Sequence, residues 1–117
     1  MIIWIASYPK SGNTWIRSFL TAYYFCENGI FDINKLNLIE DYPNKQFFKE
    51  KVKQGEIHKH WETSQKDIRD QKKVKFLKTH NSLITAFGND FTKPEFTLGV
   101  IYVIRDPRNV ITSVKNH

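Results

Sequence analysis

The stretch Ile2-Ile-Trp-Ile-Ala-Ser-Tyr-Pro-Lys-Ser-Gly-Asn-Thr-Trp15 decides the fold. Its first residues are nearly all apolar and include β-branched isoleucines, which predicts a buried strand over Ile2 to Ala6. A helical pattern starts at residue 13, directly after a turn with Gly12 at its centre. Such a turn aims backbone N–H groups and the positive helix end at one point. The sequence therefore predicts a loop that binds phosphate or sulfate.

The rest of the chain repeats the order of strand and helix. Two further apolar runs, at 74–77 and 98–104, are apolar on both faces, as strands of a covered parallel sheet are. Helical patterns occupy 13–27, 44–53 and 64–72, and Asp106-Pro107 begins a helix that continues to the end. We therefore expect an α/β fold, a P-loop-like parallel sheet flanked by helices, in one domain over 1–117.

Composition limits the classes of function. The 117 residues suit one soluble domain, and no run reaches the ~20 apolar residues that span a bilayer. A lone Cys26 and the lack of a secretion signal predict a cytoplasmic protein. Lysine and arginine outnumber the acidic residues by 18 to 12, a formal charge of +6. That excess favours anionic partners without distinguishing nucleic acid from a small phosphorylated ligand.

The predicted loop differs from an ATP-binding P-loop at its lysine. In a P-loop the lysine follows the glycine directly and precedes Ser or Thr. Here Asn13 holds that place, Thr14 keeps the hydroxyl, and the lysine is Lys10, two residues before Gly12. This displacement argues against an ordinary Mg-ATP enzyme.

The segment Tyr8-Pro-Lys-Ser-Gly-Asn-Thr-Trp15 resembles the 5′-phosphosulfate loop of cytosolic-type sulfotransferases. These enzymes transfer a sulfuryl group from 3′-phosphoadenosine 5′-phosphosulfate (PAPS) to an acceptor. The resemblance implies that PAPS is the co-substrate, that no metal is needed and that Trp15 stacks on the adenine. The alternative for Trp15 is a place in the core beneath the first helix. The cofactor-binding residues that it implies in this loop are Lys10, Ser11, Gly12, Asn13, Thr14 and Trp15.

A second segment, residues 101–113, resembles the family's 3′-phosphate motif. Arg105 follows a predicted strand, and Ser113 comes eight residues later, about two turns along the next helix. Ligands of open α/β sheets collect at the carboxyl ends of strands, and Arg and Ser both donate hydrogen bonds to phosphate. Arg105 and Ser113 are therefore expected to bind the 3′-phosphate.

A third segment, Lys78-Thr79-His80, again follows a predicted strand and resembles the family's segment with the catalytic base. An attacking hydroxyl must lose its proton, and histidine is suited to accept it near neutral pH. The resemblance makes His80 the base. Lys10 and Lys78 are expected to stabilise charge on the sulfuryl group and the leaving phosphate.

The resemblance covers residues 3 to 113 in outline, with 28–73 as a variable insert. Family members continue further, so we expect an amino-terminal portion whose missing half completes the sheet and the acceptor pocket. A small-molecule or glycan acceptor with a hydroxyl or amine is implied, and self-association is expected from an incomplete sheet. Alternatives are a P-loop-like nucleotide or kinase module, a non-catalytic PAPS-binding fragment, and a basic nucleic-acid-binding module supported only by charge.

Overall fold

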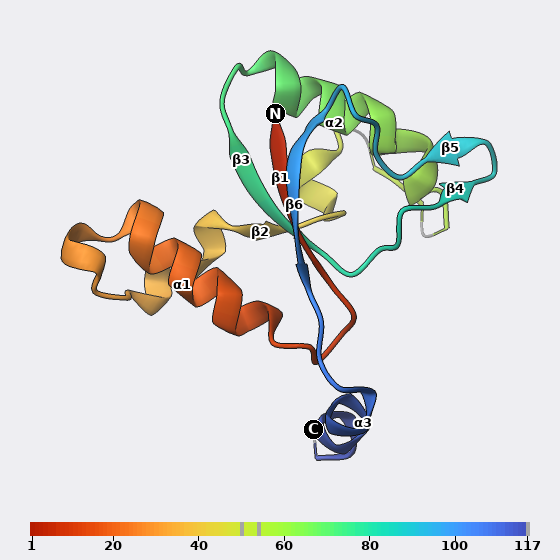
Figure 1. Ribbon diagram of the computed structural model, residues 1–117. Helices are drawn as coiled ribbons and strands as arrows, with labels where there is room; N and C mark the ends of the chain where they lie inside the picture. The colour runs from red at the N-terminus through yellow and green to blue at the C-terminus, as the bar shows by residue number, and fades with distance from the viewer. Residues whose placement is uncertain (50, 54, 117) are drawn as a thin grey trace.

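The computed structural model describes residues 1–49, 51–53 and 55–116. Its framework is a four-stranded parallel sheet in the order β2-β3-β1-β6 (Figure 1). The α/β class and the parallel sheet flanked by helices are thus confirmed. The strands are β1 (Ile2–Ser7), β2 (Glu40–Asp41), β3 (Lys75–Thr79) and β6 (Thr97–Val103).

β1 lies in the middle of the sheet and pairs on both sides. Ala6 is opposite Thr79 of β3, and Ser7 is opposite Val103 of β6. The three expected strands are therefore neighbours, and their carboxyl ends share one edge of the sheet. The fourth strand, β2, is only two residues long, which is too short to produce an apolar run. A separate hairpin joins β4 (Thr85–Ala86) to β5 (Asn89–Asp90).

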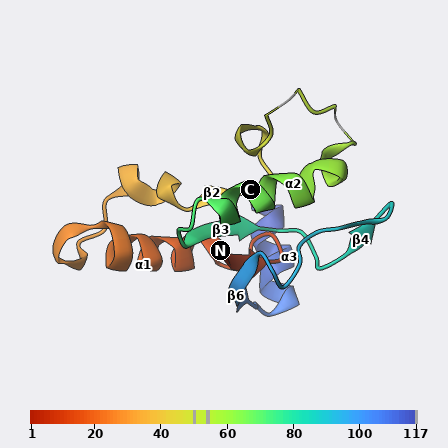
Figure 2. The same cartoon turned by 90° about the horizontal axis from the view of Figure 1, so that it is seen from above.

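The main core lies between one face of the sheet and α2 (Trp61–Asp70), which covers that face in Figure 2. Trp4 is its centre, with the rings of Tyr42 and Phe91 each 5.3 Å away, centroid to centroid. Gln65 is fully buried there and satisfied, because its amide donates to the Phe91 carbonyl and accepts from Thr92. Most of the buried hydrophobic residues therefore belong to this one cluster.

The opposite face carries α1 (Asn13–Phe25), and its packing is the reverse of what an apolar helix stripe suggests. The buried residues of α1 are polar: Asn13, Arg17 and Thr21. The aromatic residues of the expected inner face are exposed instead, by 56% to 78% of their surface: Trp15, Phe19, Tyr23 and Tyr24. Asn13 and Arg17 can be buried because they donate hydrogen bonds to the main-chain carbonyls of Ile5, Leu36 and Ile39. The hydroxyl of Thr21 has no such partner among the described residues.

Two helix predictions need correction. The helix expected over 44–53 is wrong: only Lys45–Phe47 form a 3₁₀ turn, and residues 48, 49 and 51–53 are not helical, while residue 50 lies outside the described residues. That segment has too few apolar positions to hold a helix against the sheet. The helix expected over 64–72 exists but runs from Trp61 to Asp70.

The last helix, α3 (Pro107–Lys115), begins as predicted, with Asp106 accepting a hydrogen bond from the Arg108 amide as its cap. It projects from the end of β6, and of its side chains only Val110 is buried (Figure 1). In the described part of the chain, no helix is both long and apolar enough to cross a membrane.

Candidate ligand-binding and catalytic site

The loop between β1 and α1 has the backbone geometry of an anion cradle. Gly12 precedes the first helical residue with φ of 99°, which a residue with a Cβ rarely adopts. Lys10 also has a left-handed φ, 65°, a conformation that costs a non-glycine residue about 1 kcal/mol. The first turn of α1 has no side-chain cap and no acidic residue. Its leading N–H groups are therefore available to an anion.

Arg105 connects this loop to the segment that resembles the 3′-phosphate motif. It follows β6, and its Nη1 donates a 3.0 Å hydrogen bond to the main-chain oxygen of Lys10. Arg105 is exposed, so the rest of its guanidinium fork can still reach a ligand. The two segments that resemble a 5′-phosphosulfate loop and a 3′-phosphate motif are therefore side by side.

Arg105 and Ser113 also line one shallow depression of about 440 Å³. The sequence did not single out the other residues of its wall, Asn109, Thr112 and Asn116. They follow one another at steps of three and four along α3 and the residue that caps its end, which is the spacing of one helix face, so this periodicity could have found them. The face presents hydroxyl and amide groups beside one arginine, a set that suits a phosphate.

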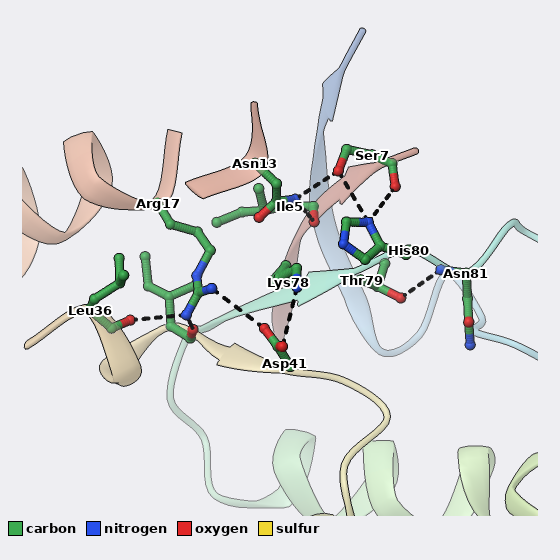
Figure 3. A network of polar contacts seen from close by, with 11 residues as sticks. Ile5, Ser7, Asn13, Arg17, Leu36, Asp41, Lys78, Thr79, His80 and Asn81 are labelled. Atoms are coloured by element: carbon green, nitrogen blue, oxygen red, sulfur yellow. Dashed lines mark hydrogen bonds and ion pairs between the residues drawn. The ribbon is translucent and has the colours of Figure 1, made fainter. Parts of the chain in front are cut away.

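His80 lies at the carboxyl edge of the sheet, against the end of β1. Its Nδ1 is 2.7 Å from the main-chain oxygen of Ser7 and 3.3 Å from the Ser7 hydroxyl (Figure 3). The side chain is otherwise exposed. His80 therefore has one ring nitrogen engaged by the protein.

Asn13 has a structural contact that the motif did not predict. Its Nδ2 donates to the Ile5 carbonyl at 3.1 Å and to the Ser7 hydroxyl at 3.0 Å (Figure 3). Asn13 is 5% exposed, so its side chain points into the sheet rather than outward. Only its main-chain amide, at the start of α1, is left to face a ligand in the loop.

Lys78 lies on the α1 face of β3, where its ammonium is 3.2 Å from an Asp41 carboxylate oxygen. Arg17 is 3.5 Å from the same carboxylate and donates to the carbonyls of Leu36 and Ile39. Burial lowers the pKa of Arg17 from its ordinary value, and the charge of Asp41 opposes that shift. Asp41 thus links a buried arginine to the lysine of the third motif (Figure 3).

Trp15 is 69% exposed on the outer face of α1, so the alternative that places it in the core is wrong. Its ring is 5.2 Å from that of Phe19, centroid to centroid. The two rings border a shallow hollow of about 370 Å³ that is mostly apolar. An exposed indole beside the loop is available for stacking on a flat ligand.

A mostly apolar cleft of about 440 Å³ opens beside His80 on the α2 face of the sheet. Polar groups gather at the end where β1 and β3 finish, at Ser7, Thr79 and His80. No charged side chain lines it among the described residues. The apolar part of its wall is formed by Trp4, Ala6, Tyr8, Leu83, Phe91, Val100 and Tyr102.

These features define an α/β protein with a strand-loop-helix unit at the carboxyl edge of a parallel sheet, and the backbone geometry of that unit suits an anion. The family model of the sulfotransferase domain matches residues 2–117, and the chain belongs to this family. No curated protein and no solved structure shows significant similarity to the chain. In the ranges that the structure describes, no three His, Cys, Asp or Glu side chains are grouped to hold a metal ion.

Proposed function

We propose that the protein is a PAPS-dependent sulfotransferase that acts on an acceptor hydroxyl or amine. The observation that carries this proposal is the 3.0 Å hydrogen bond from Arg105 to the main chain of Lys10. It brings two phosphate-type motifs together, and PAPS carries a phosphate at its 3′ position as well as a phosphosulfate at its 5′ position. A nucleotide with phosphate at one end only would contact only one of these two motifs.

The described residues fit such a nucleotide at three points. The free N–H groups of the first turn of α1, together with Lys10, would hold the phosphosulfate. Arg105 and Ser113, which share one depression, would hold the 3′-phosphate. The exposed indole of Trp15 would stack on the adenine. The bound nucleotide supplies the sulfuryl group that is transferred.

In the proposed reaction His80 acts on the acceptor. It takes the proton of the attacking hydroxyl or amine while that atom forms a bond to sulfur. The bond between sulfur and the bridging oxygen breaks, and its electron pair stays on the 5′-phosphate of adenosine 3′,5′-diphosphate. Lys10 and the helix amides stabilise the charge that grows on that oxygen.

Lys78 is the second cation in this proposal. It lies at the edge of the sheet where β3 ends, two residues before His80, and pairs with Asp41. A lysine is a mobile point charge on a flexible stem, so it can exchange a carboxylate for a sulfuryl oxygen when a ligand binds. We assign Lys78 to the sulfuryl group or the leaving group, and no metal enters the scheme.

The cleft beside His80 is the proposed acceptor site. It places polar groups at the His80 end and apolar side chains such as Trp4 and Phe91 along the wall. An acceptor with an apolar body and a hydroxyl at one end matches this distribution.

Tryptophan fluorescence tests the nucleotide part of the proposal. Trp4 and Trp61 are buried, so quenching of the exposed Trp15 should dominate when adenine stacks on it. The protein should saturate with adenosine 3′,5′-diphosphate at concentrations where Mg-ATP and a short oligonucleotide have little effect, and Trp15→Phe should lose the signal. Tighter binding of Mg-ATP would favour the kinase alternative, and tighter binding of the oligonucleotide the nucleic-acid alternative.

A further inference from the structure

The contact between His80 and Ser7 fixes which ring nitrogen carries the proton. The main-chain oxygen of Ser7 lies 2.7 Å from Nδ1, and a carbonyl oxygen can only accept a hydrogen bond. Nδ1 must therefore be the donor. A neutral imidazole has one N–H, so Nε2 keeps its lone pair and is free to accept a proton.

The same reasoning fixes the orientation of the Asn13 side-chain amide. The Ile5 carbonyl, 3.1 Å away, can only accept, so the nitrogen end of the Asn13 amide must face it. The second hydrogen of that nitrogen goes to the Ser7 hydroxyl at 3.0 Å. Ser7 and Asn13 are 4% and 5% exposed, which leaves little room for another rotamer.

We propose that Asn13 and Ser7 are positioning residues that hold His80 with its proton on Nδ1, so that Nε2 faces the acceptor as the base. The role of Nε2 in catalysis rests on the proposed function. The position of the proton rests only on the contacts between the three side chains and the main chain.

Asn13 is needed because Ser7 offers two different oxygens to the ring. The main-chain oxygen accepts only, whereas the hydroxyl, 3.3 Å from Nδ1, can also donate. A Ser7 hydroxyl that turned toward the ring would donate to Nδ1 and favour the tautomer with the proton on Nε2. The hydrogen bond from Asn13 holds the hydroxyl in the rotamer where the carbonyl is the nearer oxygen.

Nitrogen NMR of the ¹⁵N-histidine-labelled protein, at a pH where the ring is neutral, tests this directly. His80, assigned by its loss in His80→Gln, should show a protonated Nδ1 and an unprotonated Nε2. A protonated Nε2, or two averaged signals, would overturn the proposal. The readout needs neither ligand nor turnover. A wild-type spectrum as expected, with no sulfuryl transfer, would therefore contradict the proposed function and leave the positioning role intact.

Two variants separate the contributions of Asn13 and Ser7 to the position of the His80 proton. Asn13→Leu keeps the size and the main-chain amide but removes both donors, so the His80 nitrogens should move toward averaged shifts. Turnover should fall by roughly five- to tenfold, with nucleotide affinity nearly unchanged. Ser7→Ala keeps the carbonyl, so Nδ1 should stay protonated.

The matched control is Thr21→Val, which removes another buried polar group from the same stripe of α1. The Thr21 hydroxyl has no hydrogen-bond partner among the described residues, and the spectrum of His80 should not change. A folded Asn13→Leu protein with the wild-type His80 spectrum would remove Asn13 from the proposal. If Asn13→Leu does not fold, the wild-type and Ser7→Ala spectra still decide whether the Ser7 carbonyl holds the proton on Nδ1.

Discussion

Arg105 donates a hydrogen bond to the main-chain oxygen of Lys10, 3.0 Å away across 95 residues of sequence. The contact forms because β1 and β6 are neighbours and stay paired to their last residues, Ser7 and Val103. The loop after one strand and the arginine after the other therefore leave the sheet at the same point. A ligand with two anionic groups would meet both.

Arg105→Ala should lower the affinity for adenosine 3′,5′-diphosphate by roughly ten- to a hundredfold, because a charge-assisted phosphate contact is lost. The affinity for AMP should fall by much less. Arg108→Ala is the matched control. It removes the same charge from the start of α3, but Arg108 pairs with Asp106 and its side chain is 90% exposed. Calorimetry on both variants checks this, and equal losses would mean that only net charge matters.

His80→Ala should lose most of the turnover and keep its affinity for adenosine 3′,5′-diphosphate, since a base acts on the acceptor rather than the nucleotide. The matched control is His60→Gln, which should stay active: the His60 ring packs against Phe48 and does not line the cleft beside His80. Steady-state rates with any acceptor that supports turnover give the comparison. Full activity in His80→Ala would mean that another group accepts the proton of the acceptor.

Arg17→Met should destabilise the fold by about 2–3 kcal/mol, because the carbonyls of Leu36 and Ile39 lose their buried donor. Lys59→Met also removes a cation, but Lys59 forms an exposed pair with Glu56, and its loss should change stability by less than about 1 kcal/mol. Denaturant unfolding measures both. Equal effects would show that Arg17 does not anchor the insert to α1.

The outer edge of β6 is expected to mediate self-association. β6 pairs with β1 alone in the described sheet, and Leu98, Val100 and Tyr102 on it are exposed by 56% to 66%. Leu98→Lys should reduce the associated mass in light scattering, because a charge on an edge strand opposes pairing. Ile30→Lys adds the same charge to an exposed loop and should not. A monomeric wild-type protein would contradict this prediction.

Local patterns predicted the parts of the fold that depend on local physics. The apolar runs predicted β1, β3 and β6, because apolar residues on both faces are typical of strands in a parallel sheet. The expected burial of β6 was wrong: none of its residues is buried, and Leu98, Val100 and Tyr102 are exposed. The Asp106-Pro107 pair found the start of α3. β2 was missed because two residues are too few to give an apolar run, and its contacts with Arg17 are made across the fold.

The orientation of α1 escaped prediction for a related reason. Its aromatic stripe at Trp15, Phe19 and Tyr23 is a stronger sequence signal than the polar stripe at Asn13 and Arg17. The polar stripe is buried only because carbonyls at Ile5, Leu36 and Ile39 face it. In the site, the motifs predicted separate roles for Lys10 and Arg105, and the hydrogen bond between them is a finding of the structure. The contact of Asn13 with Ser7 was not predicted by any sequence pattern.

Calorimetric titration with adenosine 3′,5′-diphosphate and with AMP, side by side and without added Mg²⁺, tests the central claim most directly. If Arg105 and Ser113 hold a 3′-phosphate, the bisphosphate should bind roughly ten- to a hundredfold more tightly than AMP. Equal affinity for the two nucleotides would contradict the assignment of a PAPS site.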